Sequence, residues 1–197
     1  APRKKSVRAV PIKIVGQIMK VTALKIPDVK LIEPEVFEDD RGYFYELFNE
    51  KKFNELLGKT YRFTQDNCAY SKKNVLRGLH YQLNKPQAKL ITVTSGKIFD
   101  VAVDIRKHSP TYGKYVSAIL SSENKSSLFL PEGFAHGYLV LSDFAEIFYK
   151  VNQPWSKDTE QSLLWNDNEL NIDWPVKDNL IISNKDLNAT KFNSIVL

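Results

Sequence analysis

The chain has 197 residues, of which 43% are hydrophobic and 12% aromatic, and its formal net charge is +5. This length and composition are those of one folded domain and exclude a largely disordered chain. The single cysteine, Cys68, excludes an internal disulfide framework and fits a reducing compartment, so we expect a cytoplasmic protein. Its apolar runs fall short of the ~20 residues that a membrane helix needs, so we expect no membrane association.

The positive charge is confined to the start of the chain. Residues 1–18 contain five basic side chains and no acidic one, which leaves the rest of the chain charge-balanced. A nucleic-acid partner would therefore depend on this segment alone, and we expect none. Met19 is the only methionine, and a regular pattern begins just after it. We expect residues 1–18 to be a basic extension, either placed ahead of the natural start or native, and residues 19–197 to be a single domain.

Short segments rich in Val, Ile, Phe and Tyr recur along most of the chain, separated by Gly, Ser, Asn, Asp and Pro turns. Such segments, about 10–15 residues apart, are typical of strands in a sandwich or jelly roll. The sequence therefore predicts a mainly β fold, a cupin-type jelly roll with a few short peripheral helices. The expected strands cover residues 30–37, 43–48, 90–94, 97–105, 115–120, 127–130, 137–141 and 145–151, with a polar turn at 38–42.

One helix interrupts this pattern early in the chain. Asn49 is a suitable N-cap, Phe48 and Phe53 have the spacing of a hydrophobic staple around it, and Gly58 is a C-terminal stop. We expect this helix to be scaffold. The end of the chain, residues 155–197, mixes polar and aromatic side chains, and we expect it to pack over the barrel with one or two helical turns.

Two of the three histidines are the main candidates for chemistry, because imidazole exchanges protons near neutral pH. His80 lies in an expected strand, where alternation places it with Gln82 on the face opposite Leu79. Arg77 would share the face of Leu79, unless Gly78 introduces a bulge. His80 is either a base that faces a barrel mouth or a core histidine satisfied by a hydrogen bond.

The other candidates are ambiguous when taken singly. His136, in the run Pro-Glu-Gly-Phe-Ala-His-Gly at 131–137, either contacts a substrate or fills a turn. Lys89 and Arg77 could be solvated surface side chains. Tyr149, on a late strand, reads more readily as a core residue than as an acid.

A metal site is disfavoured by the spacing of the histidines. Jelly-roll metal sites use two histidines one residue apart, a carboxylate and a later histidine. Tyr and Gln follow His80, and His108 lies in a turn. We expect neither metal nor cofactor.

Residues 183–186, Ser-Asn-Lys-Asp, have the spacing of a helix capping box. On local grounds Asp186 is therefore a capping residue, and nothing nearby indicates a catalytic acid.

Taken together, these motifs resemble the dTDP-4-dehydrorhamnose 3,5-epimerase family, the cupin-fold enzymes of deoxysugar biosynthesis. The resemblance runs from about Met19 to Asn188 and includes Val-Leu-Arg-Gly-Leu-His-Tyr-Gln at 75–82. Cys68 and Asn168 depart from the family pattern without touching the matched acid or base. The matching segments are residues 37–44, 65–67, 75–82, 99–106, 109–111, 131–137, 149–150, 165–167, 174–175 and 183–186.

The resemblance implies a role for each matched residue. His80 matches the base that removes a proton beside the sugar ketone, and Asp186 matches the carboxylate that orients it, which replaces the capping interpretation. Lys89 matches the cation near the enolate oxygen, and Tyr149 the acid on the opposite sugar face. Further matched residues contact the substrate, and the first three named here belong to an arm that reaches a neighbouring subunit: Arg41, Phe44, Glu46, Gln65, Asn67, Arg77 and His136.

The implied reaction is cofactor-independent epimerisation at C3 and C5 of dTDP-4-dehydro-6-deoxy-D-glucose, which gives dTDP-4-dehydro-L-rhamnose. The alternatives are a 3-epimerase or ketoisomerase on a related dTDP sugar, and a non-catalytic sugar-binding module. The presence of both His80 and Tyr149 favours double epimerisation. The resemblance also implies a homodimer with arm exchange near residues 41–46.

Overall fold

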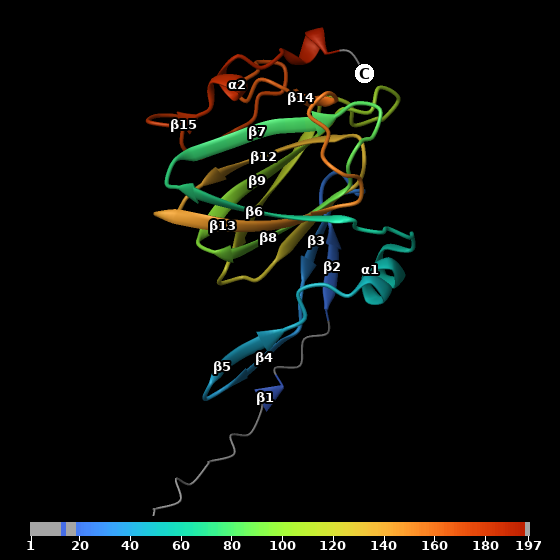
Figure 1. The fold of residues 1–197 in the computed structure, drawn as a ribbon, viewed down its shortest axis with the longest axis vertical. Helices are drawn as coiled ribbons and strands as arrows, with labels where there is room; N and C mark the ends of the chain where they lie inside the picture. Colours follow the sequence, from blue (N-terminus) through green and yellow to red (C-terminus); the bar gives the residue numbers. More distant parts are fainter. Residues whose placement is uncertain (1–12, 15–18, 196–197) are drawn as a thin grey trace, which may run out of the picture.

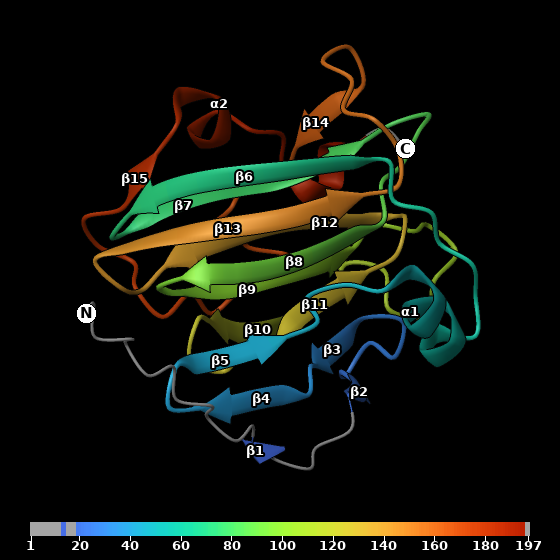
Figure 2. The ribbon, with the colours of Figure 1, turned by 60° about the horizontal axis from the view of Figure 1, so that its bottom comes forward.

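Two six-stranded sheets packed face to face make up the body of the protein in the computed structural model, which describes residues 13–14 and 19–195 (Figures 1 and 2). The first sheet has the order β2–β3–β11–β8–β13–β6, and the second has the order β10–β9–β12–β7–β14, with β15 parallel to β7. The predicted mainly β jelly roll is confirmed. The strands of the body are β2 (Lys20–Ala23), β3 (Lys30–Glu33), β6 (Gln65–Lys72), β7 (Val75–Gln82), β8 (Lys89–Ser95), β9 (Lys97–Asp104), β10 (Tyr115–Ser121), β11 (Ser127–Leu130), β12 (Phe134–Val140), β13 (Phe144–Val151), β14 (Glu160–Ser162) and β15 (Ile181–Ile182).

The main hydrophobic core fills the space between the two sheets. Alternate residues of the strands point into it, among them Ile91 and Val93 from β8, Ile98 from β9 and Ile147 from β13, none of which is exposed. This alternation determines which polar residues of the same strands also face the interior.

Smaller cores cover the outer faces of the sheets. The C-terminal segment, which includes α2 (Asn184–Leu187) and η1 (Phe192–Ser194), packs Leu163, Trp174 and Phe192 against the outer face of the β7–β9–β12 sheet. The predicted packing of the chain end over the barrel is confirmed.

The predicted helix is present as α1 (Glu50–Leu57), on the outer side of the other sheet. Asn49 accepts a hydrogen bond from the backbone N–H of Lys52, Gly58 ends the helix at φ 65°, and the rings of Phe48 and Phe53 lie 5.5 Å apart. These local signals predicted both ends of the helix correctly. No helix in the part of the chain that the structure describes is long and apolar enough to cross a membrane.

The expected strand at 30–37 is wrong in one respect, because the chain leaves the body at Pro34. Proline has no backbone N–H to continue a ladder, and the strand divides into β3 and β4 (Val36–Asp39). β4 pairs with β5 (Gly42–Tyr45), which is shorter than the predicted strand at 43–48, and with β1 (Lys13–Ile14). This hairpin, called the arm below, projects away from the sandwich (Figure 1). Except for β1, the expected basic extension lies outside the described residues.

Candidate active site

A bulge in β7 places the two basic residues of this strand on the inner face. Arg77 and His80 are three residues apart on β7, while their partners on β12, Tyr138 and His136, are only two apart. Strict alternation was therefore wrong for Arg77, and the bulge left open at Gly78 is present. Gly78 has φ 120°, and a Cβ there would lie 2.5 Å from the Cα of Gly137, so the two strands meet backbone to backbone at this point.

The bulge brings His80 into contact with Asp186, 106 residues later in the chain. The Nε2 atom of His80 lies 2.7 Å from Oδ1 of Asp186, whose Oδ2 accepts a hydrogen bond from the Gly78 N–H at 3.3 Å. Burial tends to raise the pKa of Asp186. The hydrogen bond and charge of His80 and the hydrogen bonds of Gly78 and Ser183 act against burial and lower this pKa on balance. Asp186 is therefore a buried carboxylate that holds the imidazole of His80 through Nε2.

The capping interpretation of Asp186 is half right. The hydroxyl of Ser183 accepts a hydrogen bond from the Asp186 N–H at 3.1 Å, as an N-cap does. The Asp186 carboxylate, however, also contacts the His80 ring and the Gly78 N–H, which a capping residue alone would not do. The cap fixes the first turn of α2, and this turn directs the Asp186 carboxylate toward His80.

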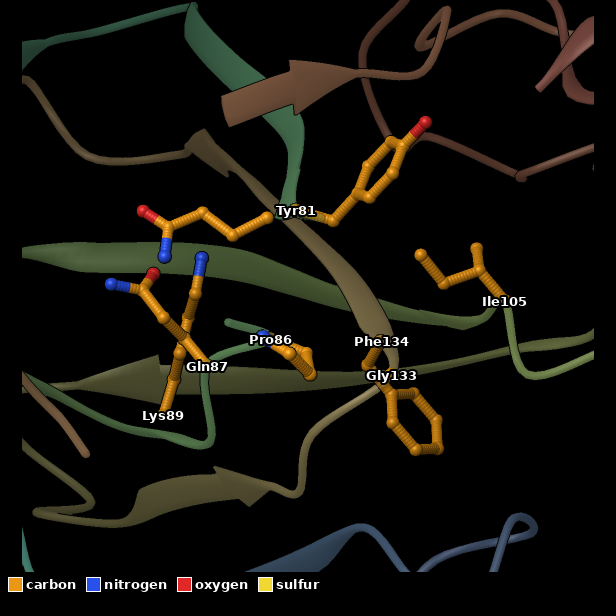
Figure 3. Close-up of a pocket in the computed structure, with 8 residues that line it drawn as sticks. Tyr81, Pro86, Gln87, Lys89, Ile105, Gly133 and Phe134 are labelled. Atoms are coloured by element: carbon orange, nitrogen blue, oxygen red, sulfur yellow. The ribbon is translucent and has the colours of Figure 1, made fainter. Parts of the chain in front are cut away.

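Lys89 is buried on the opposite sheet, with 7% of its surface exposed. It starts β8, whose inner residues Ile91 and Val93 belong to the main core. Figure 3 shows its side chain beside that of Gln87, in a small pocket that Tyr81 and Pro86 also line. Burial lowers the pKa of Lys89 to about 8, against the opposing effect of the Glu160 and Asp100 carboxylates.

Tyr149 faces the interior from β13, on the same side as Ile147. Burial raises the pKa of its phenol, the carboxylate of Glu160 raises it further, and Arg77 acts in the opposite direction. The phenol thus lies within electrostatic reach of groups on β7 and β14. It stays protonated at neutral pH, as an acid must.

The inner residues of β6 extend this polar surface. Asn67 lies directly opposite Tyr149, so the two share a face, and Asn67 accepts a hydrogen bond from the Gln65 amide at 2.8 Å. Arg77 donates to the hydroxyl of Ser71 at 3.0 Å. Cys68, which departs from the family pattern, is exposed on the other side of β6.

Two functional candidates escaped the sequence analysis, and both are carboxylates. Asp100 is fully buried, and its two oxygens lie 2.9 and 3.0 Å from Nε2 of His136. A signal for it existed, because an acid interrupting the apolar strand at 97–105 must find a partner inside. Glu160, on β14 opposite Gln82, is the second, and the mixed composition of the chain end concealed it.

The arm residues do not join this site within one chain. Arg41 is exposed and bonds to Asp39, with its Nε 3.1 Å from Oδ1. Phe44 is 69% exposed, and Glu46 pairs with Lys52 at 3.0 Å. Across residues 13–14 and 19–195 no group of three His, Cys, Asp or Glu side chains could hold a metal ion.

The comparisons with known proteins identify the family. The sequence profile described as dTDP-4-dehydrorhamnose 3,5-epimerase matches residues 23–194. The chain belongs to this family of isomerases. A dTDP-4-dehydrorhamnose 3,5-epimerase of Shigella flexneri is 54% identical over 88% of this chain and 96% of its own.

Solved structures of the epimerase family agree with the fold. That of the dTDP-6-deoxy-D-glucose-3,5-epimerase of Legionella pneumophila, in complex with dTDP-4-keto-L-rhamnose, has a TM-score of 0.89 at 47% identity and covers 91% of this chain and 95% of its own. A 3'-monoepimerase of Streptomyces bikiniensis in complex with dTDP-quinovose has a TM-score of 0.81 at 30% identity, with 86% of each chain covered. Single and double epimerases therefore share this architecture.

Proposed function

We propose that the protein epimerises dTDP-4-dehydro-6-deoxy-D-glucose at C3 and C5 to dTDP-4-dehydro-L-rhamnose, without a cofactor, and that it does so in the cytoplasm. The observation that supports this most is the contact between His80 and Asp186, at 2.7 Å, at the interior between the two sheets, which Lys89 and Tyr149 enter from the opposite sheet. A base, a cation and an acid around one interior are the groups that this reaction requires.

His80 is the proposed base. A carbon next to the C4 ketone loses its proton to the free nitrogen of His80, and the electrons of the C–H bond move to the ketone oxygen to form an enolate. Asp186 orients the ring and stabilises the imidazolium that forms. General base catalysis of this kind contributes roughly 10²–10⁴ in rate.

Lys89 is the proposed partner of the enolate oxygen. Its ammonium is held in a buried place, where a charge interacts with a developing oxyanion far more strongly than in water. Loss of one such donor costs roughly 10²–10³ in kcat in known oxyanion holes.

Tyr149 is the proposed acid. Inversion requires that the proton returns to the face of the sugar opposite His80, so one histidine cannot complete the reaction alone. The phenol gives its proton to the carbon, the enolate returns to the ketone, and solvent then restores both side chains. The same steps at C5 give the doubly inverted product.

The remaining matched residues are proposed substrate contacts. Arg77 lies beside the pocket that His80 and Asp186 line and is placed to meet the diphosphate, while Gln65, Asn67 and His136 add polar contacts.

Solvent deuterium exchange, followed by NMR, tests the reaction. Exchange at both C3 and C5 supports double epimerisation, whereas exchange at C3 alone supports the 3-epimerase alternative, which the fold also accommodates. His80→Ala should abolish exchange, and His108→Ala, at an exposed loop histidine, should not. Binding of dTDP with no exchange in the unaltered protein would indicate a non-catalytic sugar-binding module.

The arm is proposed to complete the site of a second copy in a homodimer. Its support is the exposure of Phe44 on a projecting hairpin, away from the site of its own chain. Mixing refolded His80→Ala subunits with subunits that carry Arg41→Ala and Phe44→Ala should restore activity, because one of the mixed sites then has both an intact base and an intact arm. A mixture of His80→Ala with Lys89→Met should restore none. Equal activity of a dilute monomer would contradict the exchange.

A further inference from the structure

Glu160 occupies a central place in the polar face, although neither local pattern nor family motif singled it out. It lies on β14 directly opposite Gln82, and Ser162, two residues on, lies directly opposite His80. Residues that face one another across an antiparallel pair project to the same side, and so do residues two apart on one strand. The Glu160 carboxylate is therefore on the side of His80.

Three of the four proposed catalytic groups interact electrostatically with this carboxylate. The charge of His80 lowers the pKa of Glu160, and Glu160 in turn raises the pKa of Lys89 and of Tyr149. Two other charged groups act on the same side chains. Arg77 lowers the pKa of Tyr149, and Asp100 raises the pKa of Lys89.

Glu160 is also held in place. Its carboxylate contacts the ammonium of Lys185 in α2, which precedes Asp186, and the indole of Trp155 also lowers its pKa. Burial tends to raise the pKa of Glu160, but these partners and His80 lower it on balance. The carboxylate thus remains ionised at neutral pH, with 21% of its side chain exposed.

We infer that Glu160 is a positioning residue of the proposed epimerase, whose fixed negative charge keeps the ammonium of Lys89 and the phenol of Tyr149 in their proton-bearing forms. The inference rests on the proposed function. Both groups act only with their protons on, and burial lowers the pKa of the lysine. Gln82, which lies directly opposite Glu160, lines the same pocket as Lys89, so the Glu160 carboxylate is placed to counteract this effect of burial.

The test compares two variants that break the same ion pair. Glu160→Gln removes the negative charge but keeps a hydrogen-bonding amide, so the alkaline limb of the pH–rate profile should move to lower pH. A movement of one pH unit would lower the rate above the limb about tenfold. Lys185→Gln leaves the carboxylate, so the limb should stay in place or move to higher pH. Glu160→Asp should restore the limb of the unaltered protein, and Glu146→Gln, at an exposed position of β13, serves as the control.

A purely structural tether between β14 and α2 predicts a different result. Glu160→Gln and Lys185→Gln would then lose rate equally at every pH, or would move the alkaline limb in the same direction. Either outcome overturns the inference. An alkaline limb that does not move in Glu160→Gln also overturns it. The ¹³Cζ NMR titration of Tyr149, whose resonance is the one lost in Tyr149→Phe, gives a readout that does not depend on turnover. Absence of exchange in the unaltered protein would defeat the proposed function, whereas an unchanged titration of Tyr149 in Glu160→Gln would defeat this inference alone.

Discussion

Replacement of Lys89 by methionine should make the protein more stable while it destroys the activity. The ammonium of Lys89 is buried, and its pKa falls from 10.5 to about 8 on folding. At about 1.4 kcal/mol per pH unit, that fall corresponds to about 3 kcal/mol by which the charged lysine disfavours the folded state. Methionine has a similar length and no charge, so at pH 7 the variant should gain up to about this free energy of unfolding.

The sign of this effect depends on pH. The unfolded chain keeps the proton of Lys89 up to its ordinary pKa of 10.5, whereas the folded chain releases it near 8, so the contribution of this group to stability rises with pH between these values. The advantage of Lys89→Met should therefore be full below pH 8 and should shrink toward zero near pH 10.5.

Urea unfolding of both proteins at pH 7 and pH 10 measures the difference directly. Lys72→Met, at an exposed position of β6, is the matched control and should change stability by no more than about 0.5 kcal/mol. The reasoning is refuted if Lys89→Met is no more stable than the unaltered protein at pH 7, or if the difference between them is the same at both pH values.

Three further predictions concern other residues of the site. Asp186→Asn should slow deuterium exchange by roughly 10²–10⁴-fold, because the amide cannot stabilise the imidazolium of His80; an unchanged exchange rate would exclude the proposed role. Tyr149→Phe should still exchange the C3 proton, with loss of inversion, and normal product formation would identify another acid. Gly78→Ala places a Cβ 2.5 Å from the Cα of Gly137 at φ 120° and should cost at least roughly 1–3 kcal/mol, measured as a lower Tm; an unchanged Tm would contradict the close approach.

The strands and the first helix could be predicted because their signals are local. The helix α1 has its cap, staple and stop within the eleven residues from Phe48 to Gly58. Each strand of the body alternates between the core and the other face, and short turns separate most of them. The arm was harder, because the choice between one strand and two depended on where the chain leaves the sheet at Pro34. Only the pairing of β4 with β1 and β5, in a separate three-stranded sheet, reveals that β4 does not belong to the body.

The contacts within the site could not be predicted in this way, because they join distant strands. His80 and Asp186 are 106 residues apart, and His136 and Asp100 are 36 apart. Alternation gives the face of a residue but not the neighbour across the sheet. The family resemblance supplied a role for Asp186. Asp100 left a signal in the sequence but not the identity of its partner, and Glu160 became visible only from register and burial.

The two interpretations of Asp186 describe one arrangement. Ser183 fixes the first turn of α2 by accepting the Asp186 N–H, and this turn points the carboxylate toward β7. There the bulge at Gly78 supplies two partners at once, a free backbone N–H and the His80 ring that the bulge has turned inward. Without the bulge, the Gly78 N–H would not be directed at Asp186, and Arg77 would face away from His80. The same glycine also lies close to Gly137. The backbone at Gly78 therefore sets the register of β7 against β12, donates to the Asp186 carboxylate and orients His80. A side chain at position 78 should disturb all three.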